Sequence, residues 1–363
     1  MLMTLSTIDD ATTAIIGPGL ENAFSMNQPT LNYVSCPGAS ATAPTWASAQ
    51  RRQQVEAQPE GTHRMAYWEW NHTGNPRHPH VIVCVHGLSR QGRDFDVLAT
   101  ELSRFARVIC PDVVGRGESD WLADPMGYQL PLYAADMLVL LAQLHAQAPI
   151  ETLDWVGTSM GGLIGMGIVG QPGLPLPVPV RRLVLNDVGP TIEWESLERI
   201  GSYVGKGLQF PNFESAAAAM RLISEGFGPH SDEQWSRLSQ AMIKPDAQGG
   251  VVLHYDPRIA VPMAQMTRET AQAGEALLWQ LYDQIKAQVL LIRGAESDLL
   301  SSRTAKAMTE RGPRAHCTEL QGVGHAPTLV VPGQVALIQK FLQGDKGLPA
   351  NISLAQQAQE EAA

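Results

Sequence analysis

The sequence has little that would bind nucleic acid or a membrane. Its 363 residues hold 36 acidic and 26 basic side chains, for a net charge of −10 at pH 7, and no run of basic residues. A basic patch is what binds phosphate backbones, so nucleic acid is not an expected partner. No apolar run reaches the roughly 18 residues of a membrane-spanning helix, and the first residues lack the basic start and apolar stretch of a secretory signal. We therefore expect a cytoplasmic protein with no membrane partner.

Cysteine is scarce, and no pair has the CxxC spacing typical of redox or zinc sites. Three of the four cysteines fall in predicted strands, so buried reduced thiols are expected. The histidines at positions 72, 78 and 80 are close together in the sequence but have no acidic or cysteine neighbour to complete a metal site. No metal or other cofactor is expected. The four cysteines are Cys36, Cys84, Cys110 and Cys317.

From residue 63 onward, short apolar segments alternate with segments that have helical spacing. The run VIVCV at 81–85 is typical of a central strand covered on both faces. Such alternation predicts an α/β fold with a mostly parallel sheet between two layers of helices. The predicted strands are 63–70, 81–85, 107–110, 153–156, 183–185, 288–292 and 315–320. The predicted helices are 94–105, 132–146, 160–169, 302–311 and 334–342.

Strand signals are missing between about residue 190 and residue 276, where the sequence reads as helices and loops. This stretch is typical of a helical cap inserted after one strand of the sheet. The ends of the chain do not fit the alternation either, because they are polar and lack a sustained period. The predicted organisation is a leader at 1–60, a core at 61–189 and 277–345, a cap at 190–276 and a tail at 346–363.

The segment GTSMG at 157–161 is a G-x-S-x-G motif between a predicted strand and a predicted helix. In that setting the serine occupies a tight, strained turn, and its hydroxyl projects above the sheet. The motif by itself could also be an ordinary glycine-rich turn. Its position between strand and helix favours Ser159 as a nucleophile.

A serine hydroxyl needs a base that takes its proton. His325 lies in the loop GVGHAP after the last predicted strand, where an imidazole can reach Ser159. In this type of site the acid comes between the serine and the histidine in the chain. We expect Asp298, after the strand at 288–292, to orient the imidazole. Glu296 and Asp187 are competitors, and Asp298 could instead cap the helix that follows it.

Two backbone N–H groups are needed to stabilise the oxyanion that forms during acyl transfer. Met160 follows the nucleophile directly and begins a helix, so its N–H is one expected donor. The loop after the strand at 81–85 supplies the other, and Leu88 is the expected residue. His86 is expected to brace this loop and to take no part in the chemistry.

Ser89 and Arg90 follow the oxyanion loop and are candidates for contact with the substrate. The guanidinium of Arg90 could pair with a substrate carboxylate. The alternative, which we favour, is that Arg90 and its neighbour Arg93 form ion pairs with Asp94 or Asp96. The two interpretations differ in whether Arg90 is free to bind a ligand.

In combination, these motifs resemble those of the α/β-hydrolase superfamily over residues 63–345. The resemblance implies an eight-stranded sheet, an inserted cap and a serine nucleophile that forms an acyl-enzyme. It also implies a structural role for Ser119, which lies in a turn that the family does not use for catalysis. The matching segments are HGLSRQGRDFD (86–96), PDVVGRGESD (111–120), GTSMGG (157–162), GAESD (294–298) and GVGHAP (322–327).

The expected function is hydrolysis of carboxylic esters of small molecules, which requires no cofactor. The SMGG elbow also resembles that of intracellular polyester-oligomer hydrolases, so esters of hydroxyacid oligomers are candidate substrates. Carbon–carbon hydrolases that cleave vinylogous diketones, and enol-lactonases, share the elbow and are alternatives. A further alternative is a ligand-binding protein that uses the fold without catalysis. A receptor has no need to keep the nucleophile, the base and the acid together.

Overall fold

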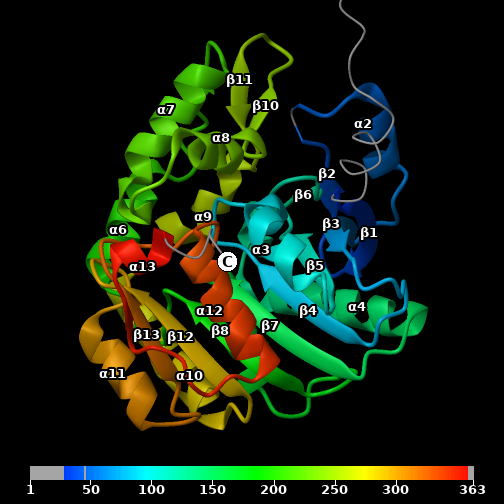
Figure 1. The fold of residues 1–363 in the computed structure, drawn as a ribbon. Helices are drawn as coiled ribbons and strands as arrows, with labels where there is room; N and C mark the ends of the chain where they lie inside the picture. The colour runs from blue at the N-terminus through cyan, green and yellow to red at the C-terminus, as the bar shows by residue number, and fades with distance from the viewer. Residues whose placement is uncertain (1–27, 45, 359–363) are drawn as a thin grey trace, which may run out of the picture.

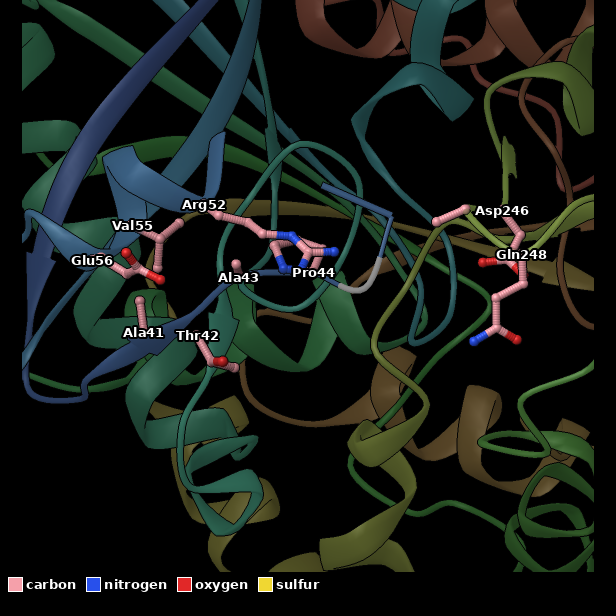
Figure 2. Close-up of a pocket in the computed structure, with 10 residues that line it drawn as sticks. Ala41, Thr42, Ala43, Pro44, Arg52, Val55, Glu56, Asp246 and Gln248 are labelled. Atoms are coloured by element: carbon pink, nitrogen blue, oxygen red, sulfur yellow. The ribbon is translucent and has the colours of Figure 1, made fainter. Parts of the chain in front are cut away.

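A computed structural model describes residues 28–44 and 46–358 of the chain (Figure 1). Within these residues a nine-stranded sheet has the order β1-β3-β5-β4-β7-β8-β12-β13-β14. Strand β3 pairs antiparallel with β1 and β5, and all other neighbours in this sheet are parallel. The strands are β1 (Thr30–Pro37), β3 (Thr62–Trp70), β4 (His80–Val85), β5 (Arg107–Asp112), β7 (Thr152–Thr158), β8 (Val180–Asn186), β12 (Gln288–Gly294), β13 (His316–Leu320) and β14 (Asn351–Ile352).

The seven strands predicted from the sequence are all present, but the expected count of eight was too low. The two additional strands lie at opposite edges of the sheet. β1 comes from the expected leader and pairs along its full length with β3. β14 comes from the expected tail and pairs with the end of β13. Edge strands have one neighbour only, and a two-residue strand has no period, so the sequence carries little signal for either.

Helices cover both faces of the sheet, as the alternating pattern predicts. Successive residues of β4 illustrate why, because Val81, Val83 and Val85 belong to one apolar cluster and Ile82 and Cys84 to the other. The first cluster includes residues of α4, α5, α10 and α11, and the second includes residues of α3 and α12. These helices are α3 (Asp96–Leu102), α4 (Leu130–Gln147), α5 (Met160–Gly170), α10 (Arg268–Gln284), α11 (Ser302–Glu310) and α12 (Pro332–Gln343).

The long segment between β8 and β12 contains helices, as expected, but the expected absence of strands was wrong, because β9, β10 and β11 form a small antiparallel sheet of order β10-β11-β9. Helices α7 and α8 and the strands β10 and β11 stand above the sheet in Figure 1. Helix α10 instead packs against α5 and runs through residue 276, the predicted end of the cap. The elements before it are α6 (Trp194–Tyr203), β9 (Gln209–Phe210), α7 (Phe213–Ile223), η3 (Glu225–Phe227), α8 (Asp232–Gln240), β10 (Ile243–Pro245), β11 (Val251–Leu253), η4 (Pro257–Ile259) and α9 (Ala260–Ala264).

The described part of the leader packs on both the core and the segment above it. Helix α2 (Ala49–Glu56) carries Arg51, whose guanidinium lies 3.1 Å from a carboxylate oxygen of Asp120. The Trp46 ring meets the ring of His254 edge-on, at 4.9 Å between centroids. Within the leader, residues 1–27 and residue 45 lie outside the described residues. From residue 28 onward, the leader is therefore part of the packed structure.

The expected tail is also ordered as far as the structure describes it. After β14, helix α13 (Leu354–Ala358) packs on α12, where the amide of Gln334 donates to Gln357 at 3.0 Å. No helix within residues 28–44 and 46–358 is long and apolar enough to span a bilayer. All four cysteines are free thiols, as expected, and only Cys317 is partly exposed.

Candidate active site

Ser159 occupies the turn between β7 and α5, with φ 50° and ψ −117°. This is a strained conformation for a residue with a side chain, and the surrounding chain holds it in place. The Ser159 N–H donates to the carbonyl of Asn186 at 3.0 Å, and its carbonyl accepts from Gly162 at 2.8 Å. A Cβ at Gly161 would collide with the carbonyl of Val85, so this position of the motif requires glycine. The strand, tight turn and helix predicted from G-x-S-x-G are all present.

His325 reaches Ser159 from the loop after β13. Its Nε2 lies 3.0 Å from the Ser159 hydroxyl. A hydrogen bond ties this loop to η3, because the N–H of Gly324 donates to the carbonyl of Gly226 at 2.6 Å. The nucleophile and the base predicted from the sequence are therefore in hydrogen-bond contact, as proton transfer requires.

The acid beside His325 is Asp187, which directly follows β8. Its Oδ2 lies 2.7 Å from Nδ1 of the imidazole. The carboxylate is fully buried and also accepts from the Ser297 hydroxyl at 2.6 Å and from the Gly294 N–H at 2.9 Å. Because a carboxylate only accepts, the imidazole donates through Nδ1, and Nε2 is left to accept from Ser159. The contacts thus assign the tautomer that a general base needs.

The prediction that Asp298 orients the imidazole is wrong. Its carboxylate forms a two-pronged ion pair with Arg199, at 2.7 and 2.9 Å, and its side chain is 49% exposed. Glu296, the other candidate of this segment, is exposed. The reason is strand order: β8 lies directly beside β7, with Asn186 paired to Thr158, so the residue after β8 emerges next to Ser159. The sequence alone shows both strands but not which of them is the neighbour.

The two expected oxyanion donors belong to segments next to Ser159, one directly after it and one in the turn after β4. Met160 is the first residue of α5, so no preceding helical turn accepts its N–H. Leu88 lies in the turn after β4, and among the described residues none accepts a hydrogen bond from its N–H. The Gly87 backbone approaches the nucleophile closely, because a Cβ at Gly87 would lie 3.7 Å from that of Ser159. The oxyanion roles of Leu88 and Met160 stay a proposal.

His86 braces the oxyanion loop, as expected. Its Nε2 accepts from the N–H of Val113 at 2.9 Å, so its Nδ1 carries the proton and donates to the Gly87 carbonyl at 2.7 Å. The pKa of His86 is lowered from 6.5 to about 3, mainly because complete burial disfavours the charged imidazole. The hydrogen bond to the Gly87 carbonyl raises the pKa, and the nearby guanidinium of Arg116 lowers it. A neutral imidazole therefore joins β4 to the turn after β5.

The depressed pKa of His86 predicts a contribution to acid sensitivity. Below about pH 6.5 the unfolded chain takes up a proton at this residue, whereas the folded protein does so only near pH 3. Keeping His86 neutral therefore costs the folded protein nothing above pH 6.5. Below that pH the free energy of unfolding falls, by up to about 1.4 kcal/mol per pH unit, because the unfolded chain binds the proton and the folded protein does not. We expect the His86→Gln variant, measured by urea unfolding at pH 7, 6 and 5, to lose less stability over this range than wild type. Parallel curves would contradict the prediction.

Arg90 does not have the free guanidinium that contact with a substrate carboxylate would need. It forms a two-pronged pair with Asp94, both contacts at 2.6 Å, and donates to the carbonyl of Leu238 in α8 at 2.8 Å. The favoured alternative is thus the one in the structure, because Arg93 also forms an ion pair, with Asp96 at 2.6 Å. Ser89 is partly exposed in the same turn, and its side chain has no hydrogen bond to any described residue. Ser89 stays a candidate for contact with substrate.

One group of side chains outside this site has metal-ligand chemistry. Cys36, His63 and Asp136 are buried between β1, β3 and α4, with their ligand atoms within 4.8 Å of one another. His63 Nε2 lies 2.9 Å from the Asp136 carboxylate, and Nδ1 lies 3.1 Å from the carbonyl of Ala39. The hydrogen bond between His63 and Oδ2 of Asp136 ties β3 to α4, and Oδ1 of Asp136 has no hydrogen-bond partner among the described residues. We assign this group a structural role.

Known proteins resemble the chain in both sequence and structure. A model of the alpha/beta hydrolase family matches residues 82–336. A 3-hydroxybutyrate-oligomer hydrolase of Cupriavidus necator is 49% identical over 290 residues, which cover 79% of this chain and 95% of the relative. A 2-(acetamidomethylene)succinate hydrolase of Mesorhizobium japonicum is 25% identical, over 69% of this chain and 84% of its own. The crystal structure of an alpha/beta hydrolase from Novosphingobium aromaticivorans is 33% identical, with a TM-score of 0.68 over 87% of this chain and 98% of that one.

Proposed function

Because the chain belongs to the alpha/beta hydrolase family, we propose that Ser159, His325 and Asp187 form its catalytic triad and that its substrates are oligomers of 3-hydroxybutyrate. The chain is an esterase-type hydrolase. The observation that carries the assignment of roles is the unbroken set of contacts from the Ser159 hydroxyl through the imidazole to the buried carboxylate. The similarity to the oligomer hydrolase, which extends over 95% of that relative, supports the substrate class.

The proposed reaction proceeds through an acyl-enzyme. The Ser159 oxygen attacks the ester carbonyl while Nε2 of His325 takes the hydroxyl proton. The N–H groups of Leu88 and Met160 stabilise the oxyanion of the tetrahedral intermediate. As the intermediate collapses, the ester C–O bond breaks and His325 gives its proton to the departing alkoxide oxygen, which becomes the hydroxyl of the neighbouring 3-hydroxybutyrate unit. A water molecule, deprotonated by His325, then releases the shortened acid and restores Ser159.

A substrate panel tests this proposal. We expect the kcat/KM for the linear 3-hydroxybutyrate trimer to exceed that for ethyl butyrate by at least about tenfold, because a pocket shaped for the branched repeat gains binding from each added group. Release of free 3-hydroxybutyrate, measured by chromatography, reports the cleavage. Ethyl butyrate is the matched control, since it has the same acyl length without the 3-acyloxy branch. Turnover confined to a vinylogous diketone or an enol-lactone would instead support one of the alternatives.

We also propose that the protein works in the cytoplasm. All four of its cysteines are unpaired, as expected where thiols are kept reduced. The partner that we propose for the protein is a small-molecule ester. Cell fractionation tests the location, and recovery of the protein outside the cytoplasmic fraction would contradict it.

A further inference from the structure

The side chain of Arg116 is fully buried and has no carboxylate in contact within the described residues. Arginine is almost never buried completely without an ionic partner, because removing its charge from water costs free energy. Here all the contacts are with neutral groups: two carbonyls, a phenol, a thioether and the faces of two tyrosine rings. Because burial of an unpaired guanidinium costs free energy, we expect a functional role of Arg116 in addition to its packing.

The guanidinium of Arg116 contacts both residues that are expected to donate to the oxyanion, Leu88 and Met160. Its Nε donates to the carbonyl of Leu88 at 2.8 Å, and its Nη2 lies 3.7 Å from the sulfur of Met160. Its Nη1 donates to the carbonyl of Val114 at 2.7 Å and to the Tyr133 hydroxyl at 2.9 Å. One buried side chain therefore contacts both residues whose N–H groups are the expected oxyanion donors.

We propose that Arg116 is a positioning residue of the oxyanion hole, which holds Leu88 and Met160 in place and contributes a buried positive charge behind them. This inference rests on the proposed function, since it concerns the same acyl-transfer site. Arg116 lies in the same turn as Ser119, the turn for which the family resemblance implies a structural role only. The structure gives the turn this further role.

The Leu88 N–H lies in the peptide plane between Gly87 and Leu88, and the next peptide plane, between Leu88 and Ser89, restrains it through the Leu88 Cα atom. The carbonyl of Gly87, which precedes Leu88, accepts from His86 at 2.7 Å and from the N–H of Arg90 at 3.1 Å. The carbonyl of Leu88 itself accepts from Arg116. With both peptide planes fixed, the Leu88 N–H has one direction, as a preorganised donor requires.

The charge of Arg116 adds to the effect of its hydrogen bonds. Its guanidinium lies over the ring of Tyr128, whose hydroxyl donates to Asp256 at 2.6 Å, and Asp256 is paired with Arg258. The carboxylate of Asp256 is thus separated from Arg116 by a phenol and engaged by another cation. In a buried setting a positive charge acts over a longer distance than in water, so it favours the transition state, in which the substrate carbonyl becomes negative.

The test compares Arg116→Met and Arg116→Lys with wild type on p-nitrophenyl butyrate. We expect Arg116→Met to lower kcat roughly 10- to 100-fold with KM within about threefold, a loss below or equal to that of one oxyanion donor. Arg116→Lys should recover part of kcat, because it keeps the charge but cannot hold two carbonyls at once. Affinity for a trifluoromethyl ketone, which forms an oxyanion on the serine, should fall in parallel with kcat.

Two further variants keep the test decisive. Arg107→Met is the matched control, since Arg107 is also a buried arginine but pairs with Glu69 at the start of β5, the end of that strand away from the loop of Leu88. It should leave kcat and inhibitor affinity unchanged. Tyr133→Phe removes one hydrogen bond from Arg116 and should lower both quantities about two- to fivefold, which gives a readout even if Arg116→Met does not fold.

The outcomes separate this inference from the proposed function. Folded Arg116 variants with unchanged affinity for the trifluoromethyl ketone would overturn the inference, as would a change in KM alone. Wild-type protein that neither hydrolyses esters nor binds this inhibitor would instead overturn the proposed function. Parallel losses of kcat and inhibitor affinity, with both quantities unchanged in Arg107→Met, would establish the positioning role.

Discussion

Replacing Asp187 with asparagine should lower kcat for ester hydrolysis by roughly 10⁴-fold while the protein stays folded. The Gly294 N–H and the Ser297 hydroxyl surround the carboxylate of Asp187. In the variant, the amide oxygen would keep the bond to Gly294, and the amide NH₂ would then face the imidazole. His325 would be pushed into the tautomer with a proton on Nε2, which cannot accept the serine proton. Steady-state kinetics on p-nitrophenyl butyrate measure the loss.

Asp298→Asn is the matched control for this prediction, because Asp298 is the acid that the sequence favoured. Its half-exposed pair with Arg199 contributes at most about 1 kcal/mol. We expect kcat of Asp298→Asn to stay within about threefold of wild type. A larger loss in Asp298→Asn than in Asp187→Asn would overturn the assignment of the acid and restore the original prediction.

Ser159→Ala should abolish measurable hydrolysis, with a loss of roughly 10⁴- to 10⁶-fold in kcat. The remaining groups can still bind the ester and its oxyanion, but no nucleophile is left to form the acyl-enzyme. A fluorophosphonate probe should add one phosphonyl group to the wild-type protein and none to the variant, as measured by mass spectrometry of the intact chain.

Ser119→Ala is the control for the second prediction. Ser119 is a fully buried serine in another glycine-rich turn, where its hydroxyl donates to the carbonyl of Asp112 and accepts from the N–H of Ala66 at 2.8 Å. Its removal should cost about 1 kcal/mol of stability and leave phosphonylation unchanged. Labelling that survives in Ser159→Ala would show that a different residue is the nucleophile.

The prediction from sequence succeeded where the relevant geometry is local. The turn at Ser159 depends on glycines two residues away on each side, and the loop of His325 on glycines and a proline beside it. Alternation of apolar residues along strands such as β4 is equally local, because side chains of a strand point to opposite faces. The strands and helices that carry the site were therefore visible from their own residues.

The prediction failed where the outcome depends on which strands are neighbours. Both Asp187 and Asp298 follow predicted strands, and each has the correct chemistry. The parallel pairing of β8 with β7 places only the former beside Ser159. In place of Asp298, the GAESD segment contributes Gly294 and Ser297, which hold the true partner of His325. Edge strands β1 and β14 were missed for a related reason, since their pairing comes from contacts distant in the chain.

By itself, the sequence determined the fold class, and it predicted the tight turn at Ser159 and the loop that brings His325 to it, because short-range patterns specify these features. Only the tertiary structure decided the acid beside His325, the edge strands of the sheet and the surroundings of Arg116. Each of these depends on distances between residues that are far apart in the chain, such as the 2.7 Å between Asp187 and His325. Such distances follow from the order of strands and the packing of helices, which local patterns do not specify.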